Sequence, residues 1–257
     1  MKIIFSKKCL EYKFPEHPES PERVKIIYDT LLENNFNFLE PKPCSEKDIL
    51  LVHTQDLLDQ VKHNSFFDRD TPNIQKIFDY AKLGVGAAIE AAESALSGEN
   101  AFSLMRPPGH HAGKDSLGGF CYFNNIAIAV EKFLKNVKLI AILDLDVHHG
   151  NGTEDIFLGR KEVQFISLHQ NPLYPGTGLV SEKNCLNYPL KNNTSSHGYI
   201  KVLKNALEEI KKFRPGLLAI SLGLDTYKNE FLAGLKLEIE DYETIGELIN
   251  NLNLKTF

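Results

Sequence analysis

The stretch Leu139–Gly152 constrains the fold of this chain more than any other, because a buried strand gives way in it to a cluster of ionisable side chains. It opens on five consecutive apolar residues, LIAIL, a pattern typical of a strand that is buried on both faces of a parallel sheet. Aspartates and histidines follow, and then glycines. Ligands of open α/β sheets bind just beyond the carboxyl ends of the strands, so we expect this polar cluster to line such a crevice.

Two side chains of the cluster have the spacing of a metal site. Asp146 and His148 are separated by one residue, and on an extended backbone such residues point to the same side. A carboxylate and an imidazole placed in this way can share one metal ion, and zinc suits mixed nitrogen and oxygen ligands. The competing interpretation is a polar loop that caps a helix and leaves His148 in solvent.

Apolar strands and amphipathic helices alternate along the rest of the chain. This alternation predicts one α/β domain with a mostly parallel sheet. The predicted strands, besides the one that opens the central stretch, are Lys2–Phe5, Ala101–Leu104, Val163–Leu168 and Leu217–Leu222, and Asn253–Phe257 resembles the opening of another. The first predicted helix has Ser20 as its N-cap and Pro21 as its first residue. Further helices are predicted from Ser45, from Thr54, and over Ile77–Leu96, Asn124–Leu134, Thr153–Leu158, His197–Phe213 and Tyr242–Leu252.

The composition argues against several classes of protein. A formal net charge of −5 and a pI near 6.0 give no basic surface for nucleic acid, so no nucleic-acid partner is expected. No apolar stretch approaches the roughly 18 residues that a membrane span needs. The N-terminus lacks the pattern of a secretory signal peptide, and the four cysteines, spaced far apart, fit reduced thiols. A soluble cytoplasmic protein without a membrane partner is therefore expected.

Polar residues follow four of the predicted strands. If these strands are neighbours in one sheet, their polar ends meet in one crevice. Asp146, His148 and Asp225 can then bind a divalent metal and leave a position open for water. A neighbouring histidine can take the proton of that water and later protonate a leaving amine, and His110 and His111 are the candidates. The strand ends carry, in chain order, His110 and His111, then Asp144, Asp146 and His148, then His169, and finally Asp225.

Six motifs, in order along the chain, resemble those of the histone deacetylase superfamily, which includes acetylpolyamine amidohydrolases and deacetylase-like proteins of bacteria and archaea. They are HPESPERV, RPPGHHAG, GGFCYFNN, LDLDVHHGNGT, SLHQNPLYPGTG and SLGLDTY. The resemblance implies a single catalytic domain over residues 1–257, with an arginase-like three-layer α/β fold and a mostly parallel central sheet. It also implies a zinc-dependent amide hydrolase that removes acetyl or other acyl groups from amines such as acetyl-lysine or acetylated polyamines.

The same resemblance implies roles for individual residues. His111 would be the general base and acid, and His110 an electrostatic partner near the metal-bound water. The metal ligands would be Asp146, His148 and Asp225, and ferrous iron accepts the same ligand set as zinc. The other implied roles are histidine orientation for Asp144 and Asn151, a potassium site at Asp144, Asp146, His148, Ser167 and Leu168, a substrate tunnel at Gly119, Phe120 and Tyr174, and an internal channel at Arg23.

Three features depart from the family pattern. Asn151 stands where many relatives have an aspartate, and an amide stabilises an imidazolium less than a carboxylate does, so a less basic histidine is expected. The segment Leu179–Leu190 lacks an expected glycine-rich loop. The chain ends at Phe257, before a Gly-Gly-Tyr loop whose tyrosine donates to the substrate carbonyl in the transition state. Losing one such donor typically costs about a hundredfold to a thousandfold in rate, and the chain is expected to lack the family's C-terminal elements.

Two other functions stay open at this point. The first is a catalytically weak or inactive module that keeps the metal and binds acylated ligands, since the tyrosine loop is missing. The second is an arginase-type dinuclear hydrolase, which would share the fold but needs more bridging carboxylates than Asp146 and Asp225 supply. The sequence does not distinguish acetylated lysine from a small acetylated amine as the substrate, and it leaves homo-oligomerisation open.

Overall fold

The computed structural model covers residues 1–257, which form two compact units. The N-terminal unit comprises Met1–Lys135 and Thr256–Phe257, and the C-terminal unit comprises Asn136–Lys255. Every pairing between the strands named below is parallel. The α/β class and the parallel strands predicted from the sequence are therefore confirmed, while one catalytic domain over residues 1–257 stays a prediction.

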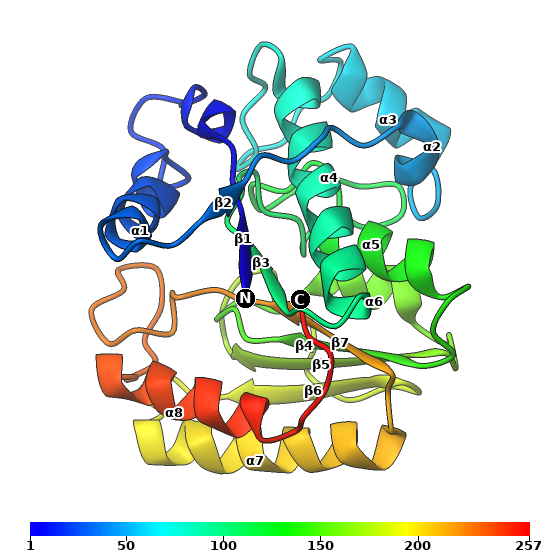
Figure 1. Ribbon diagram of the computed structural model, residues 1–257. Coiled ribbons are helices and arrows are strands. Elements are labelled where there is room, and N and C mark those ends of the chain that lie inside the picture. Colours follow the sequence, from blue (N-terminus) through cyan, green and yellow to red (C-terminus); the bar gives the residue numbers. More distant parts are fainter. The chain divides into compact units, whose positions relative to one another are not determined.

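The C-terminal unit is built on a four-stranded sheet with the strand order β6-β5-β4-β7 (Figure 1). Strand β4 (Ile140–Asp144) is the predicted apolar strand, and all of its residues are buried. It pairs with β5 (Val163–Gln170) on one side and with β7 (Leu217–Ser221) on the other. Strand β6 (Cys185–Leu190) lies at the edge beside β5. Backbone pairing next to β7 continues at Lys255, whose carbonyl accepts the N–H of Leu218 at 2.9 Å.

Two long helices of the C-terminal unit, α7 (Ser196–Phe213) and α8 (Ile239–Asn250), lie along one face of this sheet (Figure 1). Their apolar side chains and those of the strands form one buried core. The short helix α6 (Asn151–Phe157) starts directly after the paired histidines that follow β4. All three helices were predicted, although each begins a little earlier than expected. Core residues from both layers include Leu143, Ile166, Leu203, Ile210 and Ile245.

The N-terminal unit contains a three-stranded sheet with the order β2-β1-β3. Strand β1 (Lys2–Ile4) lies between β2 (Phe38–Leu39) and β3 (Ala101–Ser103). Helix α4 (Ile77–Leu96) has the predicted bounds. Its small side chains pack on the strands, since Ala87 and Ala91 of the helix share a buried cluster with Ile4 and Ala101. The small side chains of α4 thus allow the helix to lie close to the sheet.

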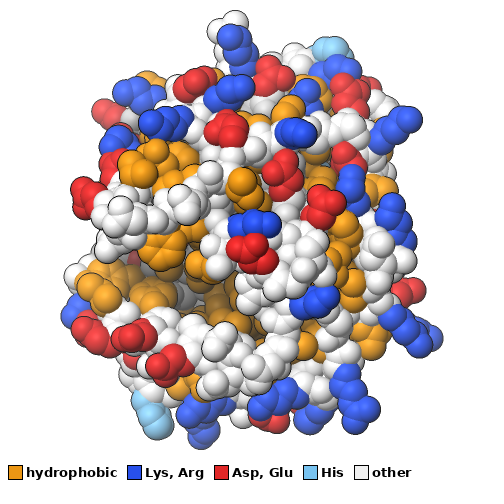
Figure 2. All heavy atoms as spheres, in the orientation of Figure 1, with side chains coloured by type: hydrophobic (Ala, Val, Ile, Leu, Met, Phe, Trp, Pro, Cys, Tyr) orange, Lys and Arg blue, Asp and Glu red, His pale blue; other side chains and the backbone are white.

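The remaining helices of this unit are shorter, and side-chain caps define the starts of all of them except α1 (Glu22–Glu33). Ser45, Thr54 and Asn124 each accept a backbone N–H from the first turn of the helix that follows. None of the helices in either unit is both long and apolar enough to cross a membrane. Acidic and basic side chains intermix over the face shown in Figure 2. The short elements are η1 (Lys7–Leu10), α1 (Glu22–Glu33), α2 (Glu46–Ile49), α3 (Gln55–Lys62) and α5 (Asn125–Phe133).

Four details differ from the sequence predictions. Helix α1 begins at Glu22 after Pro21, and Ser20 contributes its backbone carbonyl to Arg23 rather than a side-chain cap. The edge strand β6 was not predicted. Its pairing with β5 extends that strand to Gln170, so His169 lies inside the strand and not beyond its end. Strand β3 pairs with β1 and belongs to a different sheet from β4, β5 and β7, because its hydrogen bonds go to the N-terminal strand.

Candidate metal centre and histidine loop

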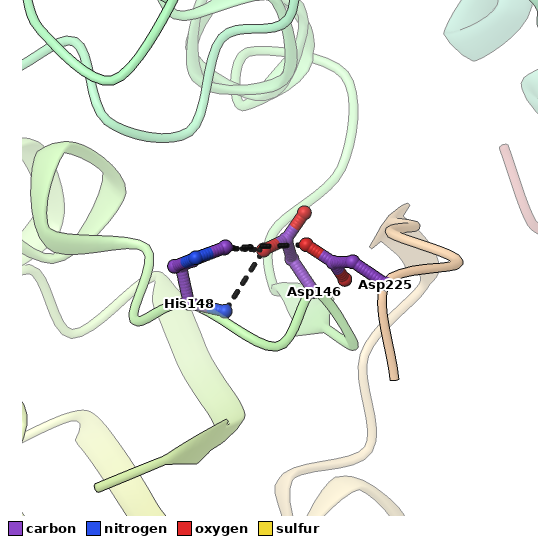
Figure 3. A group of neighbouring side chains, drawn as sticks. All are labelled: Asp146, His148 and Asp225. Atoms are coloured by element: carbon purple, nitrogen blue, oxygen red, sulfur yellow. Dashed lines mark hydrogen bonds and ion pairs between the residues drawn. The ribbon is translucent and has the colours of Figure 1, made fainter. Parts of the chain in front are cut away.

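The register of the C-terminal sheet aligns the ends of β4 and β7. Asp144, the last residue of β4, pairs with Ser167 of β5 and with Ser221 of β7. The N–H of Leu145 then donates to the carbonyl of Ser221 at 2.9 Å, which extends the contact between the two strands past β4. The loops that follow β4 and β7 therefore leave the sheet side by side, as Figure 3 shows for the segments that carry Asp146 and Asp225.

Alternation of side chains continues beyond the end of β4. Leu145 and Val147 are buried in the apolar core beneath the sheet, with exposed fractions of 2% and 0%. Asp146 and His148 are the residues between and after them, and both are partly accessible. The two polar side chains therefore share the side away from the core, as their spacing predicts.

Asp146, His148 and Asp225 converge on one point (Figure 3). Their potential ligand atoms all lie within 4.8 Å of one another. The Nδ1 atom of His148 is 3.0 Å from Oδ1 of Asp146 and 3.2 Å from Oδ2 of Asp225. The N–H of Val147 donates to Oδ1 of Asp225 at 2.9 Å, which ties the loop after β7 to the loop after β4. The structure thus brings together the three residues that the sequence suggested as metal ligands.

The electrostatics of this cluster suit a cation. Burial favours the neutral imidazole of His148, but hydrogen bonds to the two aspartates and their charges outweigh it and raise the pKa of His148 to about 10. Burial, together with the charge of Asp146, raises the pKa of Asp225 above its usual range. Two carboxylates this close repel each other, and a positive charge between them removes that repulsion. A protonated imidazole can supply that charge, and so can a divalent ion.

Glycines give the cluster its space. A Cβ atom at Gly223 would lie 2.3 Å from Oδ2 of Asp146 and 2.6 Å from Oδ1 of Asp225. A Cβ atom at Gly150 would lie 2.2 Å from Oδ2 of Asp144, the fully buried carboxylate at the end of β4. Only glycine leaves these oxygens where they are. Two carboxylates and one imidazole, held together in a cradle that a side chain would fill, fit a divalent metal.

A second polar network lies beside the metal cluster. His149 is 2% exposed, and its ring nitrogens meet Oγ1 of Thr177 at 2.8 Å and Oε2 of Glu154 at 2.9 Å. Asn187 of β6 donates to the same Glu154 oxygen at 2.7 Å. This network holds the segment after β5, which carries Tyr174, against α6 and β6. The Tyr174 ring is 44% exposed, and its centroid is 6.3 Å from that of His148.

Other predicted residues of the C-terminal unit lie along the same strand ends. The carboxylate of Asp144 accepts the N–H of Asp146 at 3.1 Å. The Ser167 hydroxyl lies 2.9 Å from Nδ1 of His169, which is inside the strand. Leu168 is fully buried in the core. Asn151 is the first residue of α6, where its N–H donates to the carbonyl of His149 at 2.8 Å.

The loop between β3 and α5 carries the paired histidines of the N-terminal unit. His110 and His111 are 7% and 6% exposed, and their ring centroids are 3.9 Å apart. Gly109 precedes them in close contact with the backbone, because a Cβ atom there would lie 2.6 Å from the nitrogen of Asn125. The Asn125 side chain donates to the carbonyl of Pro107 at 3.0 Å. The start of α5 thus holds this loop.

A buried ion pair fixes the start of this loop. Arg106 is 2% exposed, and its guanidinium donates to both oxygens of Glu19, at 2.5 and 2.7 Å. The same group donates to the carbonyl of Cys9 at 2.5 Å and lies 4.0 Å from the centre of the Tyr12 ring. Such two-pronged pairs between arginine and a carboxylate are strong and directional.

Arg23, which the resemblance places in an internal channel, is exposed on α1. Its exposure gives no support to that role.

The predicted tunnel residues of the N-terminal unit occupy a strained turn. Gly119 and Phe120 both have positive φ angles, +53° and +71°. The Phe120 N–H donates to the buried hydroxyl of Thr71 at 3.0 Å. Its ring meets the edge of the His17 ring with the centroids 4.8 Å apart. His17 therefore belongs to the support of Phe120.

Sequence reasoning missed three groups that hold these loops. They are the pair of Glu19 and Arg106, the contacts of His149, and His53, which lies between α2 and α3. Glu19 and Arg106 do stand inside the motifs HPESPERV and RPPGHHAG, so charged residues beside prolines were a usable signal. His53 follows an apolar run and carries no spacing signal.

Fold and site together define an α/β protein whose neighbouring parallel strands end in a candidate metal site. A family model described as the histone deacetylase domain matches residues 17–256. The chain belongs to the histone deacetylase family.

Individual relatives agree with this assignment. A probable deacetylase of Archaeoglobus fulgidus is 39% identical over 262 residues, which is 93% of this chain and 73% of the relative. Acetylpolyamine amidohydrolase 2 of Pseudomonas aeruginosa is 40% identical over 194 residues, which is 71% of this chain and 55% of that protein. The crystal structure of an acetylpolyamine aminohydrolase from Burkholderia pseudomallei has 25% identity and a TM-score of 0.93, covering 100% of this chain and 91% of that one. These names support a deacetylase or amidohydrolase. They give no support to an inactive binding module.

Proposed function

We propose that this chain is a zinc-dependent amide hydrolase that removes acetyl groups from amines. The observation that carries the proposal is the convergence of Asp146, His148 and Asp225, whose ligand atoms lie within 4.8 Å of one another, in a chain of the histone deacetylase family. In this proposal the three side chains hold the metal. When bound, zinc polarises the amide carbonyl and lowers the pKa of the attacking water.

The paired histidines handle the proton in this proposal. A neutral imidazole of His111 accepts a proton from water as the water oxygen attacks the acetyl carbon. When the carbon–nitrogen bond breaks, the same imidazole returns that proton to the leaving amine, so acetate and a free amine are formed. His110, with its ring centroid 3.9 Å from that of His111, tunes the charge of its neighbour. Both side chains are buried, which strengthens their electrostatic effect on the reacting groups.

Two further groups of residues would hold the histidines and line the approach of the acyl chain. Asp144 and Asn151 are the proposed partners of the histidine rings. Asp144 lies two residues before Asp146, and Asn151 lies three residues after His148. Gly119 and Phe120, supported by Thr71 and His17, and Tyr174, supported by the His149 network, are the proposed tunnel walls. This assignment is supported by the restraint on the rings of Phe120 and Tyr174, since each ring lies on a loop that is fixed by buried hydrogen bonds.

A structural potassium ion remains part of the proposal. Its ligands would be Asp144 and backbone oxygens at Asp146, His148, Ser167 and Leu168. The carboxylate of Asp144 is fully buried and aligned with Ser167 across the sheet. A cation beside a buried carboxylate offsets the cost of taking that charge out of water.

A cytoplasmic location is proposed because the four cysteines are all free thiols.

Steady-state deacetylation by the zinc-loaded protein tests the proposal. An acetyl-lysine peptide and an acetylated polyamine are offered side by side, with His111→Ala as the comparison. Removing a general base typically costs about a hundredfold to ten-thousandfold in rate, so turnover should fall by that factor while bound zinc stays at one per chain. Asp225→Asn should lose both zinc and turnover.

The outcomes separate the parts of the proposal. The faster substrate gives the amine class, and metal analysis of protein purified with and without air distinguishes zinc from ferrous iron. A wild-type chain that binds one zinc and turns over neither substrate would contradict the deacetylase assignment. Equal turnover by wild type and His111→Ala would contradict the assignment of the base.

A further inference from the structure

We infer that His53 is a positioning residue for the paired histidines, and this inference rests on the proposed function of that loop. His53 lies outside the loop, between α2 and α3, and is 4% exposed. Its imidazole joins two distant points of the segment that carries His110 and His111. The inference assigns it no contact with substrate, only control of where the loop backbone lies.

The loop needs such a support because it has no regular structure of its own. From the end of β3 to the start of α5 the backbone forms turns and bends, with a single isolated bridge between Gly118 and Cys121. Buried carbonyl and N–H groups in such a segment must find partners outside a helix or a strand ladder. Side chains from elsewhere in the unit therefore decide its path.

His53 supplies two of these partners. One ring nitrogen, Nδ1, is 2.8 Å from the carbonyl oxygen of Gly113. The other, Nε2, accepts the backbone N–H of Asn124 at 2.9 Å. Because a carbonyl can only accept and a backbone N–H can only donate, the ring is neutral and carries its proton on Nδ1. One imidazole thus joins Gly113, two residues after His111, to Asn124, which directly precedes α5.

Asn124 and Thr54 complete the clamp. The Asn124 side chain donates to the carbonyl of Ala112 at 3.0 Å and accepts the N–H of Ala127, so one residue joins the loop to the start of α5. The N–H of Thr54 donates to the carbonyl of Lys114 at 2.9 Å. The backbone carbonyls of the three residues that directly follow His111 are therefore all held, by the Asn124 side chain, the His53 ring and the N–H of Thr54.

The position of His53 is itself fixed. Its N–H donates to the carbonyl of Ile49 at 3.1 Å, and its ring lies near that of Phe123, with the centroids 5.5 Å apart. Ile49 of α2, Leu57 of α3 and Phe123 are themselves buried. An anchored imidazole of fixed tautomer transmits the position of α2 and α3 to the loop, and small displacements of a catalytic group cost rate steeply.

Two substitutions of His53 distinguish positioning from general support. His53→Leu keeps an apolar side chain and removes both hydrogen bonds, whereas His53→Gln offers one donor and one acceptor. Val61→Ala, in the buried face of α3, is the control for lost stability without lost loop contacts. We expect kcat of His53→Leu to fall by about 10- to 100-fold, with KM and bound zinc within twofold of wild type. His53→Gln should recover most of kcat, and Val61→Ala should keep it.

Amide hydrogen exchange makes the test independent of activity. The N–H of Asn124 should be protected in wild type and in His53→Gln and should exchange much faster in His53→Leu, at a matched margin below the unfolding temperature. A wild-type chain without turnover would contradict the proposed function, and the exchange measurement would then judge the clamp alone. Unchanged protection in His53→Leu, or a kcat loss that Val61→Ala shares, would overturn the role of His53.

Discussion

Replacing Gly223 with alanine should weaken metal binding and leave the fold intact. A Cβ atom at this position would lie 2.3 Å from Oδ2 of Asp146, and Cβ contacts shorter than 3.0 Å are essentially absent from proteins. Moving that oxygen from 2.3 to 3.0 Å displaces it by about 0.7 Å. The second carboxylate, Asp225, must move as well, since its Oδ1 would lie 2.6 Å from the new atom.

The size of this displacement sets the expected loss. Ligand distances in metal sites hold to within about 0.2 Å, so the shift at Asp146 exceeds what zinc coordination tolerates. Changes beside metal ligands typically cost about 10- to 100-fold in affinity, which corresponds to about 1.4–2.7 kcal/mol. The clashing atoms are the ends of side chains and can rotate, so the metal-free Tm should stay within about 4 °C, or about 1 kcal/mol.

Competition against a chromogenic chelator measures the zinc affinity directly. Gly246→Ala in α8 is the matched control, because a Cβ atom there would meet nothing within 4 Å. Gly223→Ala should bind zinc at least tenfold more weakly than this control at the same temperature and pH. An affinity within threefold of the control would refute the view that Asp146 and Asp225 hold the metal.

Two predictions concern stability. Gly86→Ala should lower the unfolding free energy by about 1–3 kcal/mol, because a Cβ atom at this position of α4 would lie 1.8 Å from the carbonyl oxygen of Lys42. Thermal unfolding measures this loss, and an unchanged Tm would contradict the prediction. Burial lowers the pKa of both His53 and His169 from 6.5 to about 4. At His169 the charge of His149 lowers the pKa as well. Both stay neutral when folded, so their contribution is complete above pH 6.5 and falls toward pH 4, by up to about 1.4 kcal/mol per pH unit for each. Urea unfolding at several pH values should give a smaller slope for His53→Gln, and an equal slope would count against a neutral buried His53.

The metal cluster could be predicted because short-range rules position it. Apolar runs marked β4 and β7, and the spacing of Asp146 and His148 put them on one side of the chain. The rule that parallel strands present their loops at one edge then brought in Asp225. Each step used only the local pattern and the topology of the sheet.

The supports of the neighbouring loops could not be predicted in this way. The edge strand β6 contains Asn187 and Pro189, and neither favours a strand. Proline is tolerated there because an edge strand leaves some N–H positions unpaired. Without β6, the contact between Asn187 and Glu154 has no basis in sequence, and the anchoring of the Tyr174 segment through His149 follows only from the folded structure.

The candidate metal ligands and the paired histidines are therefore held by different means. Asp146 and His148 extend a strand whose backbone pairs on both sides, so many hydrogen bonds and a buried core share the task of placing them. His110 and His111 lie on an irregular loop, where a few side chains such as His53 and Arg106 carry the same task. Substitutions of single polar residues should consequently disturb the position of His110 and His111 more than that of Asp146 and His148. The residues that sequence patterns mark least clearly are those on which the geometry of the histidine loop depends most.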